Sequence, residues 1–264
     1  MIFEVCASSF ESAKNAQIAG AQRIELCSEL GVGGITPSYG LITKVMEELY
    51  ILNCVLIRPR SGDFTYSDEE FDIMLRDIKF CKELDCEGVV TGVLHKDGEI
   101  DIERTKRLME AAGSMDFIYH RAFDCTPNPE KAIEELKKLG VKRILSSGQK
   151  KTAIEGKELI KELVKISKEG KKKFEKGFPE VMMACGFKLP NEIGEMLNYT
   201  HATSFHMSAK KIINSEMEYR NPEVNMGLEG FSEYQKLETD KKTVEMYYDF
   251  LCEFIKNVQN LKSK

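Results

Sequence analysis

The stretch IFEVCASSFESAKNAQIAGAQRIELC, residues 2–27, decides the fold. It opens with a strand-like run, Ile2–Ala7, continues with a helical segment that ends at Gly20, and closes with a second strand-like run at 23–27. A strand, a helix and a strand in this order indicate two parallel strands joined by a helical crossover.

The same unit recurs along the rest of the chain. Six further strand-like runs lie at 53–60, 88–94, 116–122, 143–148, 180–186 and 203–209. Eight such units within 264 residues match a (β/α)8 barrel, which typically takes ~250 residues. We therefore predict an α/β fold, a single-domain (β/α)8 TIM barrel over residues 1–264, in preference to an open doubly wound sheet. A polar extension at 210–240 precedes the last helix, expected at 241–261.

Capping residues indicate where the helices begin. Thr36 followed by Pro37 favours a helix start, because threonine caps helices and proline fits the first turn. Ser67 and Glu70 form a capping box for a helix that runs to about residue 84. A further helix is expected over residues 152–168.

The composition excludes several classes of protein. The net charge is −5, from 38 basic and 43 acidic residues, so no broad basic surface for nucleic acid is expected, and the basic run at 171–176 is interpreted as a solvated face. No segment approaches the ~20 apolar residues of a membrane helix, and the N-terminus lacks the features of a signal peptide. We therefore expect a cytoplasmic protein whose eight cysteines stay reduced. No CxxC pair occurs, which argues against a structural zinc site.

Several strands alternate between apolar and polar residues, which buried parallel strands usually do not. In Ile2–Ala7, Phe3 and Val5 share one face, while Glu4 and Cys6 share the other. The outer face must meet apolar helices, so the polar set is expected to point toward the barrel axis. The side chains expected there, near the C-terminal strand ends, are Glu4, Glu25, Arg58, Arg60, His120 and His206. Enzymes with this fold build their sites at that end.

The segment FIYHRAFD, residues 117–124, ends a strand of the same kind. We predict that His120 points inward with Ile118 beneath it, and that Arg121 or Asp124 lies in the rim loop. An inward direction for Phe117 and Tyr119 is the alternative.

Buried charges must pair or contact water, so this cluster allows three interpretations. It is an ion network that fills the barrel mouth, an interaction scaffold, or a site for a small anionic metabolite. In the last case the protein is an enzyme with no organic cofactor. Its candidate catalytic residues are Glu4, Glu25, His120 and Asp124, and its candidate ligand-binding residues are Arg58, Arg60, Arg121 and His206.

Two consecutive strands carry the pattern Glu-x-Cys, in FEVC and IELC. Neighbouring strands lie ~4.8 Å apart, so Cys6 and Cys27 are expected to face each other, directly or after a small shift. Two neighbouring thiolates suit Cu(I), which prefers soft ligands. The alternatives are two small buried hydrophobic side chains or a transient disulfide.

The turns SSG at 146–148 and ACG at 184–186 follow the sixth and seventh strands. Barrels often bind phosphate through backbone amides in this region. A single glycine in each turn is, however, more typical of a plain tight turn.

Five segments carry a resemblance to a known family: EVCASSFESAKNAQIAGAQRIELCSELGVGGITPSYG, IRPRSGDFTYSDEEFDIMLRDI, HRAFD, KLGVKRILSSGQ and YRNPEVNMG…SEYQKLETD. In order and spacing, the chain resembles the CutC copper-homeostasis family. The resemblance implies a cytosolic (β/α)8 barrel, a homo-oligomer such as a dimer or tetramer, and a role in copper handling. The family's proposed Cu(I) ligands match Cys6 and Cys27, and its polar cluster matches Glu4, Glu25, Arg58, Arg60, His120, Arg121 and Asp124.

Two segments depart from the family pattern. A Gly-rich run usually follows the seventh strand, whereas MACGF keeps only Gly186, and SFHMSAK also departs modestly. The resemblance favours Cu(I) binding at Cys6 and Cys27 as the function. An enzyme that acts on a small anionic metabolite through the Glu, Arg and His residues is the alternative.

Overall fold

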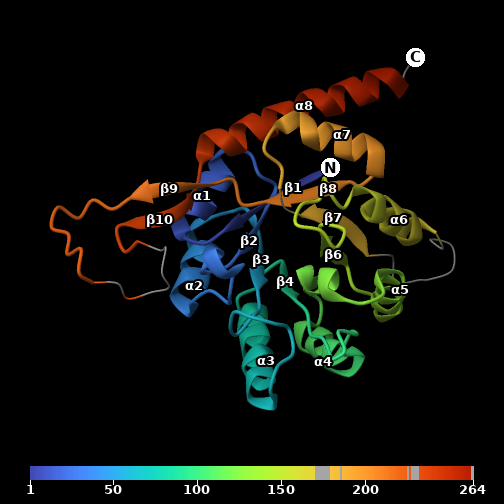
Figure 1. Ribbon diagram of the computed structural model, residues 1–264, viewed down its shortest axis with the longest axis horizontal. Helices are drawn as coiled ribbons and strands as arrows, with labels where there is room; N and C mark the ends of the chain where they lie inside the picture. Colours follow the sequence, from blue (N-terminus) through green and yellow to red (C-terminus); the bar gives the residue numbers. More distant parts are fainter. Residues whose placement is uncertain (170–178, 185, 225, 227–231, 263–264) are drawn as a thin grey trace.

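Eight parallel strands close into a barrel, as the sequence predicts (Figure 1). The computed structural model describes residues 1–169, 179–184, 186–224, 226 and 232–262, so the basic run at 171–176 and Cys185 lie outside the described residues. Each strand pairs with the next, and β8 returns to pair with β1. The strands are β1 (Ile2–Ala7), β2 (Arg23–Leu26), β3 (Leu52–Leu56), β4 (Gly88–Thr91), β5 (Asp116–Tyr119), β6 (Arg143–Ser146), β7 (Glu180–Ala184) and β8 (Ser204–Met207).

Helices surround this barrel on the outside (Figure 1). They are α1 (Phe10–Ile18), α2 (Tyr39–Glu48), α3 (Asp68–Glu83), α4 (Ile102–Ala112), α5 (Pro129–Leu139), α6 (Lys157–Lys168), α7 (Pro190–Thr200) and α8 (Lys241–Lys262). Two short 3-10 helices, η1 (Leu30–Val32) and η2 (Arg121–Cys125), lie in the loops after β2 and β5. None of the helices in the described part of the chain is long and apolar enough to cross a bilayer.

The predicted start of the second helix is wrong by a few residues. α2 begins at Tyr39, because the Ser38 hydroxyl caps it by accepting a backbone hydrogen bond of the first turn. The Thr36 hydroxyl instead accepts the backbone N–H of Arg58 at 2.9 Å. The threonine thus fixes the loop after β3 rather than a helix end.

The capping box on Ser67 and Glu70 begins α3 as predicted. By contrast, α6 begins at Lys157 rather than at residue 152. The reason is close backbone packing before the helix: a Cβ on Gly156 would lie 2.0 Å from the carbonyl oxygen of Ser147. The segment that precedes Lys157 therefore packs against the turn after β6 instead of continuing the helix.

The polar extension contains an antiparallel strand pair, which the sequence pattern did not predict. β9 (Lys210–Asn214) and β10 (Gln235–Thr239) project from the barrel beside α1 (Figure 1). The Thr239 N–H donates to Ser12 Oγ at 3.1 Å, and Asn15 Nδ2 donates to the Thr239 carbonyl at 3.1 Å. These bonds anchor β10 on α1.

The alternation along the strands separates an outer core from two smaller buried clusters. Phe3, Val5, Phe117 and Tyr119 belong to the outer core that lies against the helices. One smaller cluster consists of Cys6, Cys27, Cys54, Leu56, Val90 and Ile118, and the other of Leu145, Met182 and Ala184. The prediction that Ile118 points toward the axis is confirmed, and the alternative direction for Phe117 and Tyr119 is wrong.

A buried ionic group lies where the barrel closes. Glu4 on β1 stands opposite Arg23 on β2 and opposite His206 on β8. Its Oε2 accepts a hydrogen bond from Arg23 Nε, and its Oε1 lies 2.8 Å from His206 Nδ1. Burial alone would raise the pKa of Glu4, but the hydrogen bond with His206 and the charge of Arg23 outweigh it and lower this pKa to about 2. Glu4 is therefore a carboxylate at neutral pH, held by partners from both neighbouring strands.

This lowered pKa predicts how the stability of the fold depends on pH. A carboxyl group whose pKa is lower in the folded state stabilises the folded protein. This contribution is complete above the unfolded-state pKa, here ~4.3, and is lost as the pH falls to the folded-state pKa of about 2. We expect Glu4→Gln to reduce the free energy of unfolding by roughly 3 kcal/mol at pH 7, with the deficit shrinking between pH ~4.3 and ~2. Urea denaturation of both proteins at a series of pH values measures this difference.

Glu48→Gln is the matched control, because Glu48 pairs with Lys44 on the exposed face of α2. An exposed pair contributes little, so this variant should show no comparable pH-dependent deficit. A deficit of Glu4→Gln that stays constant from pH 7 to pH 3 would contradict the assignment of a charged, paired Glu4.

Candidate functional site

A cavity of about 680 Å³ opens at the C-terminal end of the barrel. Six of the ten predicted site residues line it: Cys6, Glu25, Arg58, His120, Arg121 and His206. Of the other four, Glu4, Cys27 and Asp124 each contact a lining residue. The ion-pair partner of Arg60, Glu70, lies outside the cavity. The folded chain therefore brings most of the predicted residues to one place.

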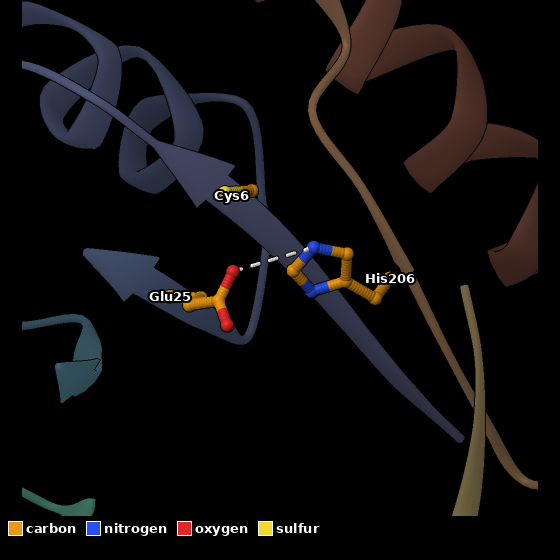
Figure 2. Close-up of side chains that lie close together, drawn as sticks. All are labelled: Cys6, Glu25 and His206. Carbon is orange, nitrogen blue, oxygen red and sulfur yellow. Dashed lines mark ion pairs between the residues drawn. The ribbon is translucent and has the colours of Figure 1, made fainter. Parts of the chain in front are cut away.

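Cys6, Glu25 and His206 form a compact group at this cavity (Figure 2). One ligand atom from each lies within 4.8 Å of the others, and all three side chains are buried. Cys6 stands opposite Glu25 in the register of β1 and β2, while His206 enters from β8. Figure 2 shows Glu25 and His206 pointing toward each other. The distance between Glu25 Oε2 and His206 Nε2 is 3.6 Å.

The protonation of this group follows from burial and from close charges. Burial raises the pKa of Glu25, although the neighbouring His206 opposes the shift. Burial would lower the pKa of His206, but the carboxylates of Glu25 and Glu4 outweigh it and raise this pKa. Both imidazole nitrogens of His206 thus face carboxylates, so the ring is held in place from two sides.

Cys6 and Cys27 lie in contact, with 3.5 Å between their sulfurs. The strand register places Cys6 opposite Glu25, so the cysteines meet diagonally, after the small shift that the sequence allowed. The hydrogen bond with Cys27, and then burial, raise the pKa of Cys6 well above its usual value. Cys6 is therefore a thiol at neutral pH, which makes it a poor nucleophile without another activating group.

Arg58 follows β3 and reaches the cavity from a loop. Its Nη1 donates to the carbonyls of Val32 and Gly34 at 3.0 and 2.7 Å, and its Nη2 donates to the Gly62 carbonyl at 2.7 Å. The guanidinium also lies 5.2 Å from the centre of the Phe64 ring. No carboxylate of the described residues lies within 4.0 Å of it, so neutral carbonyls hold this buried cation in position.

His120 lies directly after β5 and lines the same cavity. Its Nδ1 accepts the Ala122 N–H at 3.2 Å, and its ring packs 4.8 Å from the Phe64 ring. Only glycine fits at position 92, because a Cβ there would lie 2.7 Å from His120 Nδ1. Burial, helped by the charge of Arg58, lowers the pKa of His120 to about 3. The ring is neutral at pH 7, so it serves there as a hydrogen-bonding group rather than as a source of protons.

Asp124 and Arg121 lie in the rim loop, as predicted, and bond to each other. Asp124 Oδ1 accepts from Ser146 Oγ at 2.6 Å, and Oδ2 accepts from the Ser147 N–H at 3.0 Å and from Arg121 Nε at 2.9 Å. Arg121 also donates to Ser147 Oγ at 2.6 Å. These bonds tie the loop after β5 to the loop after β6, and they orient Arg121 at the cavity.

Arg60 points away from the cavity, contrary to the strand-based prediction. β3 ends at Leu56, so the alternation of side chains does not extend to residue 60. Arg60 donates to Glu70 at the start of α3 and lies 5.1 Å from the Tyr66 ring. Its partners are therefore in the following loop and helix.

The turn after β6 does not offer the phosphate cradle that barrels often have, and the turn after β7 includes Cys185, which lies outside the described residues. The N–H groups of Ser147 and Gln149 already donate to Asp124. Gly186 has a positive φ of 90°, and a Cβ there would lie 2.4 Å from Thr152 Cβ. Within the described residues, these glycines and amides serve packing and loop structure.

Two residues near the site were not selected from the sequence. Arg23 pairs with Glu4, and its place in the alternating run of β2 was a usable signal. Tyr247 lines the cavity from α8. No local pattern identifies Tyr247, because only the closed barrel brings the last helix to the cavity.

Comparison with known proteins agrees with this fold. The CutC family model matches residues 1–211. A CutC family protein from Parabacteroides distasonis is 44% identical to this chain over 249 residues, which cover 93% of this chain and 98% of the relative. The crystal structure of CutC from Streptococcus agalactiae, whose name links it to copper homeostasis, is 32% identical with a TM-score of 0.71, covering 79% of this chain and 98% of that one.

Phosphoribosyl anthranilate isomerase from Thermotoga maritima has a TM-score of 0.53 and covers 95% of this chain and 98% of its own. At 13% identity this similarity shows the barrel fold alone. The match to the CutC relatives differs from this structural similarity, because it combines high sequence identity with coverage of most of both chains. The family model matches residues 1–211, and curated relatives are similar along most of their length, so the chain belongs to the CutC family.

Proposed function

We propose that this protein binds one Cu(I) ion between Cys6 and Cys27. The observation that carries the proposal is the contact of the two sulfurs, 3.5 Å apart, at a cavity open to the C-terminal end of the barrel. Cu(I) prefers soft ligands, and two thiolates supply them. Membership of the CutC family supports a copper-related role.

The surroundings of the two sulfurs suit a soft ion. Cys27 is fully buried, and Leu56, Val90 and Ile118 pack in the same interior cluster. Such an apolar surrounding limits the access of water to the bound ion. The proposal also requires reduced sulfurs, which the cytoplasmic location expected from the sequence would provide.

A second arrangement of ligands is possible around Cys6, because Glu25 and His206 also lie within reach of one ion. Thiolate, imidazole and carboxylate together suit Zn²⁺. However, both nitrogens of His206 already face Glu4 and Glu25, and a metal bond would disrupt one of these contacts. The sulfur pair is therefore the better seat, and the two arrangements differ in whether Cys27 or Glu25 is required.

Anaerobic titration with Cu(I) against a competing chelator tests the proposal. We expect one ion per chain, and we expect Cys6→Ser and Cys27→Ser each to weaken binding by at least about 100-fold, the upper end of what loss of a supporting partner costs. Cys54→Ser is the matched control, because Cys54 is buried in the same cluster but is not part of the group around Cys6. It should bind Cu(I) like the unchanged protein.

The outcome for Glu25→Gln separates the two ligand sets. Retained Cu(I) affinity in this variant supports the sulfur pair. If Cys27→Ser binds normally while Glu25→Gln does not, the ion belongs to the Cys6, Glu25 and His206 group instead. Equal affinity in all variants would place the ion elsewhere.

The affinity for Cu(I) should increase with pH. The pKa of Cys6 is raised by its hydrogen bond with Cys27 and by burial, so the ion must displace a proton from this thiol. We expect the apparent dissociation constant to fall by about tenfold or more per pH unit between pH 6 and pH 8, since at least one proton is released per ion bound. Titrations at three pH values measure this slope, and a pH-independent affinity would rule out binding through the Cys6 thiol.

A further inference from the structure

Three buried polar groups on the cavity lining have no hydrogen-bond partner. Over the described part of the chain, seven buried side-chain nitrogen or oxygen atoms lack one, and these include Arg58 Nε, His120 Nε2 and the Tyr247 hydroxyl. The three residues are each at least nine-tenths buried and line the same cavity. Leaving such a group without a partner costs about 1–3 kcal/mol, so their concentration at one cavity indicates a ligand that satisfies them.

All three groups can donate a hydrogen bond. The neutral His120 ring accepts at Nδ1, so its proton resides on Nε2. Arg58 uses three of its N–H groups on carbonyls, which leaves two of the five that an arginine carries, one of them on Nε. The ligand that fits these donors is therefore an acceptor.

The charge of the lining also favours an anion. The described residues that line the cavity include four basic side chains and one acidic side chain. The basic residues are Arg58, Arg121, Lys188 and Lys210, and the acidic residue is Glu25. The chain as a whole carries −5, so this positive lining runs against the overall charge. A cleft lined by one sign of charge attracts small ligands of the opposite sign.

The shape of the donors favours a carboxylate over a phosphate. Arg58 and His120 both lie against Phe64, at 5.2 and 4.8 Å from its ring, and a guanidinium fork matches a planar carboxylate. A phosphate usually requires several backbone amides, and those after β6 already donate to Asp124.

We propose that the cavity binds a small organic acid whose carboxylate contacts Arg58 and His120 and whose second acceptor group contacts Tyr247. Phe64, Leu145 and Phe187 line the cavity and supply apolar contacts for the carbon chain between the two polar ends. The volume of about 680 Å³ is in the range of metabolite sites. This binding function is separate from the proposed copper site, because it uses none of the cysteines.

Calorimetric titration of metal-free, desalted protein at constant ionic strength tests this proposal. The probes are C3–C6 monocarboxylates and dicarboxylates, represented by butyrate and succinate, with inorganic phosphate as the competing anion. We expect saturable binding of at least one dicarboxylate, tighter than that of the monocarboxylate of equal length. The absence of saturable binding across the panel, or binding of phosphate alone, would overturn the proposal.

Variants locate the two ends of the ligand. Tyr247→Phe removes a hydroxyl without a partner, so we expect unchanged or higher stability, about tenfold weaker binding of the dicarboxylate, and unchanged binding of the monocarboxylate. Arg58→Lys should weaken both by about tenfold or more, because it keeps the charge but removes the fork. If both variants bind the acids normally, the proposal is wrong.

Arg60→Lys is the matched control for Arg58→Lys. It makes the same chemical change two residues away, on a side chain that points away from the cavity. Arg60→Lys should bind the acids like the unchanged protein. Equally weakened binding in Arg58→Lys and Arg60→Lys would show that the change is not specific to position 58, and it would contradict the proposed contact of the carboxylate with Arg58. Cys6→Ser should also bind the acids normally, so failure of the copper proposal and failure of this one are distinguishable.

Discussion

The ionic contact between Glu4, Arg23 and His206 is the constraint on which the interior of this barrel depends. A carboxylate that is about 1% exposed must be compensated, and its two partners come from the strands on either side of β1. One of these strands is β8, so the contact spans the point where the barrel closes. The same contact holds His206 from below, while Glu25 faces it from the cavity side. The position of His206 at the cavity therefore depends on the buried contacts of Glu4, which the folded protein must retain.

Two kinds of chemistry thus lie close together at one cavity. The sulfurs of Cys6 and Cys27 come from β1 and the residue after β2, and they suit a soft cation. Arg58 and His120 come from the loops after β3 and β5, and they suit a hard anion. The cations on the lining favour the approach of an anion, whereas the buried sulfurs are shielded within the apolar interior cluster. The two proposals, a Cu(I) site at the sulfurs and a pocket for a small acid, therefore rely on different residues of the same barrel mouth.

The predictions from sequence succeeded where a residue lies inside a strand. Glu4, Cys6 and Glu25 were placed on the inner face because the strand alternates with a period of two, and each of them is buried inside the barrel. The prediction for Arg60 failed because β3 ends four residues earlier, and beyond it the loop follows hydrogen bonds such as that from Arg58 N–H to Thr36. Thr36 itself was a good capping residue in isolation, yet that contact, distant in sequence, takes its hydroxyl.

The sequence by itself determined the barrel, the direction of most strand side chains and the meeting of Cys6 with Cys27, because these follow from local periodicity and from the fixed spacing of neighbouring strands. Only the tertiary structure decided which buried groups are satisfied. Arg58 finds carbonyls instead of a carboxylate, His120 loses its charge through burial beside Arg58, and Tyr247 reaches the cavity from the last helix. Each of these outcomes depends on atoms that are far apart in the chain, and no local pattern records how such groups come together.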